Sequence, residues 1–251
     1  MVQILRKFAI LLLLVSPCWA QSPACPQILL TNINCHTLTG GGTGTTCTTY
    51  PIDTTGATQI VIGMVAYNSG ANTNTVSSSP SNSWTPLTNW GNTQFFYATA
   101  PTTGTTQTFT CNNGPSGNRF VCFVLVYSGV GDFDAGTDNG ADSYPTPVLS
   151  LATGPITPAQ KYDLILSLGE TRGGPSLTAD SGLGTKDSYN LSFGYTGSIA
   201  SLTDSSASPI NVTWSDGGSY AMGVSIAGFV PLLPGSYSGC PATTSSRVRI
   251  F

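Results

Sequence analysis

The 251-residue sequence predicts an all-β protein, an antiparallel β-sandwich or barrel of roughly ten short strands. Three observations predict this class. Apolar or alternating segments recur at fairly regular intervals, separated by turns rich in Gly, Asn, Ser and Pro. Charged residues make up only 8% of the chain, compared with roughly 25% in an average soluble domain. About a quarter of the residues are Ser or Thr, and Thr and the aromatic residues favour strands.

Each expected strand is short and either continuously apolar or alternating. The first, residues 59–67, is a continuous apolar run that is too short for a helix and rich in β-branched residues. In another, Ile210, Val212 and Trp214 share one face, and polar residues share the other. In chain order, the expected strands are residues 59–67, 84–90, 94–98, 107–111, 119–127, 148–151, 162–168, 188–195, 210–214 and 220–229.

The segments between these strands are expected to be loops. The longest, residues 129–147, carries several Asp and Gly residues and no apolar run. The only helix start, at residues 157–160, stops within about five residues because the helical pattern does not continue. No internal repeat is evident, so residues 58–231 are expected to form a single β-sandwich domain, which is long enough to bury an ample core.

The N-terminus predicts export. Within residues 1–20, Arg6 and Lys7 precede an apolar core at residues 8–15, which is the pattern of a signal peptide cut before Gln21. A secreted or cell-surface protein is therefore expected. No later segment reaches the ~20 apolar residues of a membrane helix, so no membrane span is expected after signal removal. The expected organisation is a signal peptide at 1–20, a Cys-rich extended lead-in at 21–57, the β-sandwich domain at 58–231 and a C-terminal tail at 232–251.

Cysteine usage agrees with export, because six of the seven cysteines remain after cleavage and an even number predicts disulfides. Cys111 ends one strand-like run and Cys122 lies near the start of the next, with a turn-rich segment between the two runs. We therefore expect the two runs to form a hairpin with a disulfide across it. The other four cysteines allow three pairings, of which we favour Cys35–Cys47 and Cys25–Cys240. A zinc site is disfavoured, since the chain has no C-x-x-C pair and a single histidine, His36.

Charge and composition exclude two classes of protein. Only eight residues are Lys or Arg and the net charge is −3, too few cations for a nucleic-acid interface. Hydrophobic residues make up 40% of the chain, which is too many for a disordered protein.

Four aspartates lie close together in the sequence, within the expected loop 129–147. They are Asp132, Asp134, Asp138 and Asp142, and two glycines lie between the first and the last of them. Carboxylates on a flexible loop suit Ca²⁺, and a cation would relieve their mutual repulsion. The sequence thus gives the hypothesis of a weak Ca²⁺ site. A solvated acidic loop is the alternative, because the spacing is not that of an EF-hand and no Glu closes the loop.

Catalytic motifs are absent from the sequence. There is no G-x-S-x-G elbow, and a catalytic triad would have to use His36 in the lead-in. Glycoside hydrolysis needs two carboxylates, and the only Glu is Glu170, with Asp163 on the preceding strand. A secreted hydrolase is therefore the third hypothesis for function.

Aromatic residues offer a binding hypothesis. Trp90, Trp84 and Tyr97 are candidates for stacking on sugar rings, and Trp90 is expected to be the most exposed because it lies beside a turn. The alternative is that these side chains pack into the core.

The order of several short segments resembles secreted bacterial β-sandwich domains of jelly-roll type, over about residues 58–231. These segments are Ser83-Trp-Thr85, Phe96-Tyr-Ala98, Tyr127-Ser-Gly-Val130, Phe133-Asp134, Asp163-Leu-Ile-Leu166 and Ala221–Phe229. The resemblance implies export and a jelly-roll-like sandwich, and it implies no catalytic residues, since these domains have no assigned activity. The expected function is an extracellular interaction or structural module that contacts a polymer or surface component. A carbohydrate-binding module, with polysaccharide as the partner, is the alternative.

Overall fold

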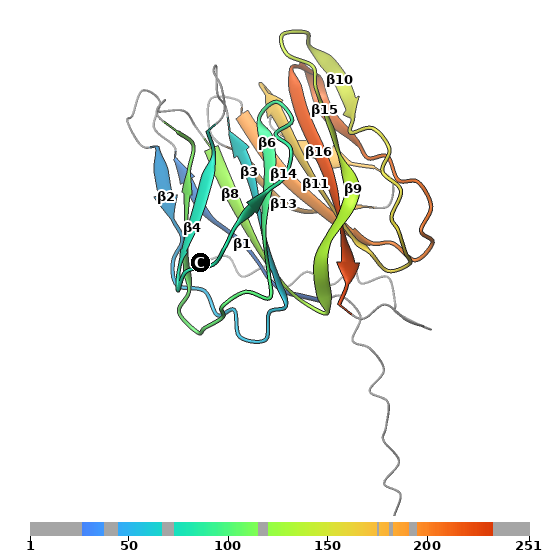
Figure 1. Ribbon diagram of the computed structural model, residues 1–251. Helices are drawn as coiled ribbons and strands as arrows, with labels where there is room; N and C mark the ends of the chain where they lie inside the picture. The colour runs from blue at the N-terminus through green and yellow to red at the C-terminus, as the bar shows by residue number, and fades with distance from the viewer. Residues whose placement is uncertain are drawn as a thin grey trace, which may run out of the picture.

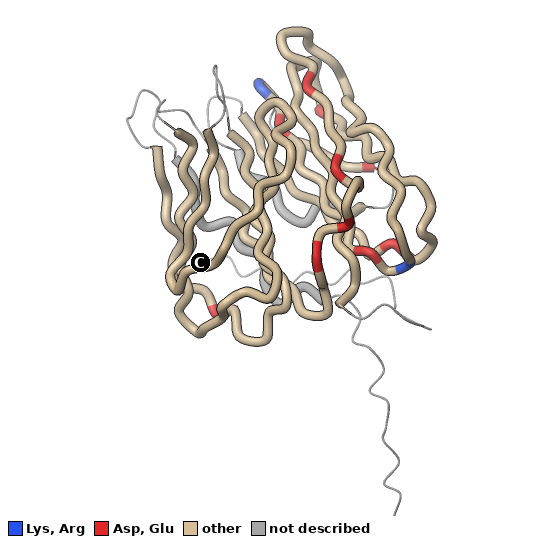
Figure 2. Tube along the Cα trace, viewed as in Figure 1, with Lys and Arg blue, Asp and Glu red and all other residues tan. Residues whose placement is uncertain are grey.

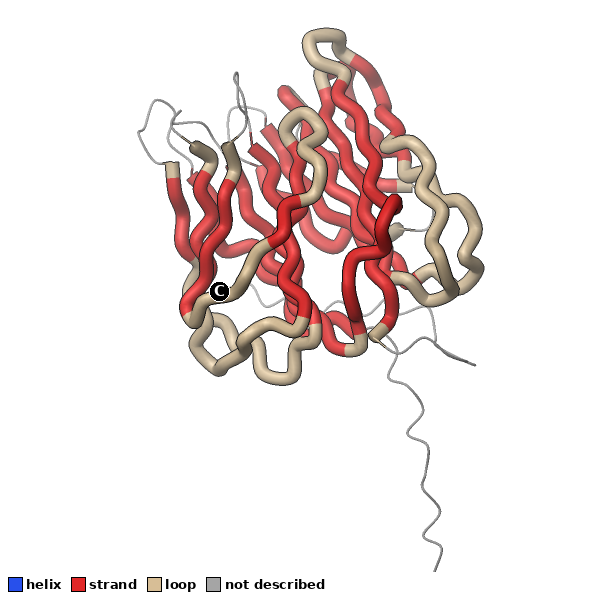
Figure 3. Tube along the Cα trace, viewed as in Figure 1, coloured by secondary structure: helices blue, strands red, loops and turns tan. Residues whose placement is uncertain are grey.

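The computed structural model describes residues 27–37, 45–66, 73–114, 120–174, 176–180, 183–190 and 195–232. These residues form sixteen strands and no helix, so the all-β prediction is confirmed (Figure 3). Consequently, no described segment is a helix long and apolar enough to cross a membrane. The expected signal peptide, most of the expected tail and the Cys25–Cys240 pairing lie outside the described residues.

The strands divide equally between the two halves of the chain (Figure 1). The first half contains β1 (Gln27–Thr37), β2 (Thr46–Thr48), β3 (Gln59–Ala66), β4 (Thr75–Ser79), β5 (Thr85–Pro86), β6 (Thr93–Thr99), β7 (Thr108–Asn112) and β8 (Phe120–Ser128). The second half contains β9 (Val130–Asp142), β10 (Val148–Ala152), β11 (Leu164–Arg172), β12 (Leu177–Ala179), β13 (Gly184–Asn190), β14 (Tyr195–Thr203), β15 (Thr213–Tyr220) and β16 (Met222–Pro231).

Both halves have the same strand order. In the first, a five-stranded sheet runs β1-β8-β3-β6-β5 and a three-stranded sheet runs β2-β7-β4. In the second, the sheets run β9-β16-β11-β14-β13 and β10-β15-β12, which is the same order with eight added to every number. All the named pairings are antiparallel. The chain therefore contains two copies of one eight-stranded unit, a repeat that the sequence did not reveal.

Matching hydrogen bonds fix the equivalence of the two units. Thr49 donates its N–H to the Phe109 carbonyl and accepts the Phe109 N–H on its hydroxyl. Thr153 makes the same two hydrogen bonds with Val212. The sequence at these points is Thr-x-Pro-Ile twice, at residues 49–52 and 153–156. Each Ile forms an isolated bridge to the residue two positions before the partner of its Thr, which is Gln107 in the first unit and Ile210 in the second. At this place, the two units have only this four-residue motif in common in their sequences.

The four sheets stack in four layers with a core in each gap. The first core lies between β2-β7-β4 and the adjoining five-stranded sheet, and it includes Ile62, Phe109 and Val124. The central core lies between the two five-stranded sheets. The third lies between β10-β15-β12 and its five-stranded sheet, around Trp214. The two three-stranded sheets are therefore the outer layers, and Figure 1 shows β2 and β4 at one side and β10 at the other.

The two units face each other with an approximate two-fold relation. β3 faces its own counterpart β11, while β6 faces β16, the counterpart of β8. Reciprocally, Gly197 of β14 packs against Val121 of β8. On this axis, a Cβ on Gly63 would lie 2.8 Å from Leu168, the residue at the same position of the second unit. The glycine of one unit thus leaves room for the leucine that occupies the same position in the other unit. Two equivalent positions that meet on a two-fold axis can pack in this way once their residues differ.

All ten expected strand segments contain or border strands, but five strands were missed: β1, β2, β4, β9 and β12. The expected loop 129–147 is wrong, because residues 130–142 form β9 and pair with β16. The lead-in contributes β1 and β2, and the expected 68–82 loop region contains β4. The segment 188–195 spans the end of β13 and the start of β14. β2 and β12 have three residues each, β4 is polar and β9 is rich in Gly and Asp, so these four strands lack the apolar pattern that strand prediction uses. β1 does carry an apolar run, at residues 28–30.

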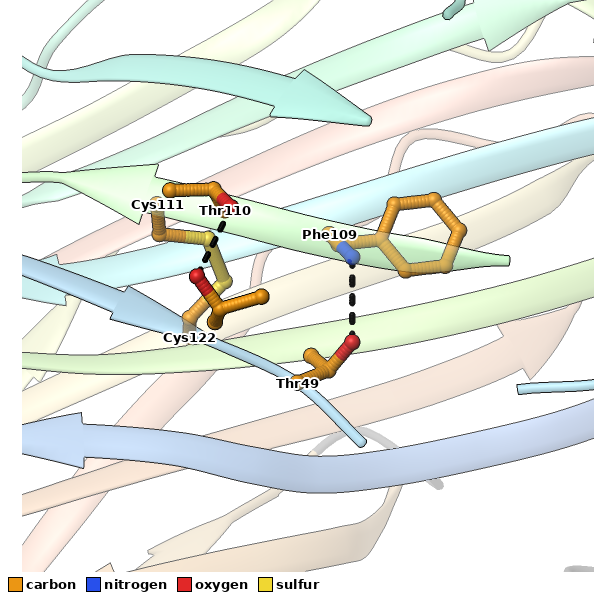
Figure 4. The surroundings of a disulfide bond; sticks show 6 residues. Thr49, Phe109, Thr110, Cys111 and Cys122 are labelled. Carbon is orange, nitrogen blue, oxygen red and sulfur yellow. Dashed lines mark hydrogen bonds between the residues drawn. A yellow bond between two sulfur atoms is a disulfide. The ribbon is translucent and has the colours of Figure 1, made fainter. Parts of the chain in front are cut away.

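The Cys111–Cys122 disulfide is present, but the hairpin that we expected around it is wrong. β7 and β8 belong to different sheets, so the bond joins the outer sheet to the five-stranded sheet behind it (Figure 4). The Cα atoms are 6.6 Å apart, and both side chains are buried in the core. Cys47 is disulfide-bonded as well; Cys111 and Cys122 bond each other, so its partner, for which we favoured Cys35, lies outside the described side chains.

Replacing both Cys111 and Cys122 by Ser is expected to lower the free energy of unfolding by about 2–4 kcal/mol, because the bond restricts the unfolded chain. Urea denaturation under non-reducing conditions measures the change. Peptide mapping of the native protein provides the control. A free thiol at either position, or a double variant as stable as the parent, would contradict the cross-link.

Candidate functional site

The three aromatic candidates do not form a common surface. Trp84 is half-buried and packs edge-on against Phe109, at 6.0 Å between ring centroids. Tyr97 is also half-buried, with the rings of Phe133 and Phe229 each 5.8 Å away. Trp90, which we expected to be the most exposed, is half-buried too. All three side chains thus have structural partners, and no stacking platform combines them.

The four aspartates of the calcium hypothesis lie along β9 and have separate partners. Asp132 accepts a hydrogen bond from the Thr99 hydroxyl at 2.9 Å. Asp138 accepts from the Trp90 indole N–H at 3.0 Å and from the backbone N–H of residue 88 at 2.9 Å. All three donors belong to the first unit and both carboxylates to the second, so Asp132 and Asp138 hold the two units together along one edge.

The other two aspartates point elsewhere. Asp134 is buried and accepts the Ala159 N–H at 2.8 Å, and Asp142 lies 3.6 Å from the Arg172 guanidinium. Over the described residues, no three His, Cys, Asp or Glu side chains are gathered in a way that could hold a metal ion. The four aspartates are close in sequence, but their carboxylates do not meet at one point, because the thirteen-residue strand β9 spreads them along its length.

Glu170 is the most unusual charged residue in the structure. It is 1% exposed, yet it lies between the two units, where it accepts hydrogen bonds from Asn92 Nδ2 at 3.2 and 3.3 Å and from Arg172 Nε at 3.1 Å. Arg172 also lies close to Asp142, and its guanidinium carbon is 4.4 Å from the Tyr144 ring centroid. Glu170 is thus a buried carboxylate, joined to the first unit through Asn92 and neutralised by an arginine of its own strand.

Burial raises the pKa of Glu170 to about 7, although Arg172 and Asn92 oppose the shift. Such a pKa suits a general acid or base. A glycosidase, however, needs two carboxylates that both face the substrate. Here both Glu170 oxygens are occupied by intramolecular donors, and Arg172 binds both carboxylates, Glu170 and Asp142. The geometry therefore favours a role in joining the two units over the hydrolase hypothesis.

Stability is expected to fall as pH rises from about 4.5 to about 7. In this range the unfolded chain has released the Glu170 proton while the folded chain still holds it, so the folded state binds more protons and loses stability with rising pH. The shift corresponds to roughly 3 kcal/mol. Thermal unfolding at pH 4 to 9 measures the effect, and Glu170→Gln, which cannot titrate, should make this part of the profile less steep. A Glu170→Gln profile with the same slope as the parent would contradict the assignment.

A second buried carboxyl titrates in the same direction. Asp163 precedes β11, and burial together with the nearby carboxylate of Asp134 raises its pKa to about 8. The group is therefore protonated at neutral pH and extends the loss of stability to higher pH.

The outer face of the β2-β7-β4 sheet carries hydroxyl and amide side chains only. Along these strands Cys47, Val76, Phe109 and Cys111 point into the core, so the alternate residues point to solvent. We call these alternate residues the first outer face: Thr46, Thr48, Thr75, Ser77, Ser79, Thr108, Thr110 and Asn112.

The first outer face is ordered in rows across the strands. The register aligns Thr46, Asn112 and Thr75 in one row and Thr48, Thr110 and Ser77 in the next. Within the second row, the Thr48 and Thr110 hydroxyls are hydrogen-bonded at 2.8 Å. Figure 2 shows no charged residue on these strands, whereas acidic residues gather in the second unit. The spacing of the rows is that of the sheet, about 4.8 Å between strands and about 6.7 Å along them.

The second unit presents an equivalent row on the opposite outer sheet. Ser150, Ser215 and Thr178 are aligned across β10-β15-β12, and all three are exposed. They are the counterparts of Thr46, Asn112 and Thr75. With the half-buried Thr213 they form the second outer face. Asp216 of β15 points inward to the Thr171 hydroxyl and adds no charge to this face, whereas Asp180, opposite Thr213, is exposed and places one carboxylate at its edge.

The outer faces were missed because hydroxyl residues carry no motif. The signal lies in alternation: Thr46-Cys-Thr48, Thr75-Val-Ser77 and Thr108-Phe-Thr110 each place a core residue between two hydroxyl residues. Segments 46–48 and 75–79 are too short and polar to be predicted as strands, so their faces could not be assigned without the structure.

Comparison of the chain with protein-family models, curated proteins and solved structures finds no match. The resemblance to secreted bacterial β-sandwich domains therefore stays a prediction.

Proposed function

We propose that this chain is a secreted, non-catalytic module of two jelly-roll-like sandwiches that binds a neutral polysaccharide through its outer faces. Support for the jelly-roll class comes from the strand order. In each unit, a sheet that begins 1-8-3-6 packs on a sheet ordered 2-7-4, as in eight strands wound as two Greek keys. β5 and β13 extend the five-stranded sheets and leave the outer sheets with three strands.

The observation that carries the proposed binding function is the composition of the first outer face. Its eight side chains are all Thr, Ser or Asn, each of which both donates and accepts hydrogen bonds. A polysaccharide presents hydroxyls at regular intervals, and a surface of hydroxyls in rows can pair with them. Without charges on this face, a charged polymer gains no electrostatic attraction. None of the eight side chains is aromatic or aliphatic, so the face differs from the core of a protein–protein interface, although the exposed Tyr50 lies two residues beyond Thr48.

Retention on an insoluble polysaccharide tests this proposal. The purified protein should bind microcrystalline cellulose or chitin, and binding should change little between low and high salt because no ion pairs are involved. A variant carrying Thr110→Lys and Ser215→Lys, one lysine at the centre of each outer face, is expected to lose at least about tenfold in affinity, because it buries an unpaired ammonium against the polymer.

The matched control is Ala135→Lys with Thr102→Lys. Both positions are exposed, on the edge strand β9 and in the loop after β6, and neither belongs to an outer face. This control adds the same charge and should bind as the parent does. Loss of binding in Trp90→Ala instead, with the lysine pair unaffected, would favour the aromatic alternative and contradict the proposal. A parent protein that binds neither polymer would also contradict it.

A further inference from the structure

The two outer faces lie on opposite sides of one molecule. The order of layers is outer sheet, five-stranded sheet, five-stranded sheet, outer sheet, as the three cores require. Packed sheets are about 10 Å apart, so the outer sheets are separated by about 30 Å. Figure 1 shows them at the two sides of the molecule. Because each outer sheet packs its inner face on a core, the exposed surfaces face away from each other.

The two faces share one equivalent row of side chains. The row Thr46–Asn112–Thr75 and the row Ser150–Ser215–Thr178 occupy the same positions of the repeated unit. Both rows consist of small neutral side chains that donate and accept hydrogen bonds. The second face is smaller and differs in its surroundings: the row that matches Thr48–Thr110–Ser77 is Ala152–Thr213–Asp180, which carries an exposed carboxylate. β10 also adds Leu149, which is 66% exposed. A neutral polymer that binds the row Thr46–Asn112–Thr75 therefore meets matching chemistry in the row Ser150–Ser215–Thr178.

The joint between the units is rigid. The central core contains Phe95, Tyr127, Leu166 and Phe229, all buried, and Glu170 with Asn92 adds a buried polar link. The connection between β8 and β9 is Gly129 alone, at φ 73°, a conformation that favours glycine. This packing prevents either unit from rotating to bring both outer faces to the same side of the molecule.

We infer that the protein is bivalent and bridges two neutral polysaccharide chains or fibres, one on each outer face; this inference rests on the proposed function. Two sites on one scaffold strengthen binding to a single surface only if both can reach it. Here the faces point in opposite directions, so the second face can only engage a second polymer. The fixed geometry directs the molecule to cross-linking.

Bridging is tested with dispersed cellulose nanofibres, scored by turbidity and by sedimentation at low speed, while bound protein is measured in the same samples. The parent protein should aggregate the fibres at intermediate protein-to-fibre ratios and less at large excess, when each fibre is saturated. Thr110→Lys alone and Ser215→Lys alone should each still bind, through the unaltered face, but should lose most of the aggregation. The Ala135→Lys control should aggregate fibres as the parent does.

The outcomes separate the inference from the proposed function. Binding without aggregation by the parent would overturn bivalency and leave polysaccharide binding intact, as would aggregation by both single-face variants equal to that of the parent. Absence of binding by the parent would overturn both. Circular dichroism of each variant checks folding, and a second pair, Thr48→Lys and Thr178→Lys, gives the same test at neighbouring exposed positions.

Discussion

Replacing Arg172 by Met is expected to lower the free energy of unfolding by about 3–5 kcal/mol at pH 8, because it leaves the buried carboxylate of Glu170 without its countercharge. The Arg172 side chain is only 8% exposed and that of Glu170 2% exposed, so water cannot replace the lost partner. Asn92 remains, but a neutral donor compensates a buried charge only in part. Denaturant unfolding of parent and variant measures the effect.

Two comparisons make this prediction specific. First, the loss in free energy of unfolding should be smaller at pH 5. Removing Arg172 raises the pKa of Glu170 further, so its carboxyl is protonated at that pH and needs no countercharge. Second, the double variant Arg172→Met, Glu170→Gln should recover most of the lost stability, because it removes both charges together. A double variant no more stable than Arg172→Met would contradict the account of Glu170 as a buried charge that needs its arginine.

Trp214→Ala is expected to cost a similar amount, about 3–5 kcal/mol. The indole is fully buried at the centre of the third core, and its N–H donates to the Ser167 hydroxyl at 2.8 Å. It packs on Gly169, where an added Cβ would lie 2.5 Å from the ring, so Gly169→Ala should also destabilise by about 1–3 kcal/mol. Thermal and denaturant unfolding measure both changes.

The repeat explains why this tryptophan matters. Trp214 occupies the position of Cys111, and Val224, which lies in the same core, occupies the position of Cys122. One unit therefore ties its outer sheet to the inner sheet with a disulfide, and the other does so with a buried ring. Trp214→Phe is the control and should cost less than the alanine variant, since most of the packing volume stays. Equal stability of Trp214→Ala and the parent would show that the third core is not packed as described.

The sequence was sufficient to predict the strand-forming core. Continuous apolar runs gave β3, β8, β11 and β16, which are buried on both faces because each lies in an inner layer. The four-layer arrangement could not be predicted, since it depends on which sheets face each other. The repeat was hidden because packing pairs such as Gly63 with Leu168 preserve volume while changing residue identity.

Only the residue types of the candidate site could be predicted from the sequence. The abundance of Ser and Thr was plain, but their gathering on outer faces depends on β2, β4 and β12, which are five residues long or less. The acidic segment 132–142 was conspicuous and suggested calcium, yet the partners of Asp138 come from a segment about 50 residues earlier in the chain. Pairings over such distances leave no local trace in sequence.

The central claim is that the outer faces bind the ligand and that Glu170 serves to join the two units. Binding isotherms on microcrystalline cellulose and chitin test it most directly, with Glu170→Gln and the variant Thr110→Lys, Ser215→Lys measured side by side. The account predicts that Glu170→Gln binds as tightly as the parent and that the lysine variant loses at least about tenfold in affinity. Weakened binding by Glu170→Gln, with full binding by the folded lysine variant, would contradict the claim.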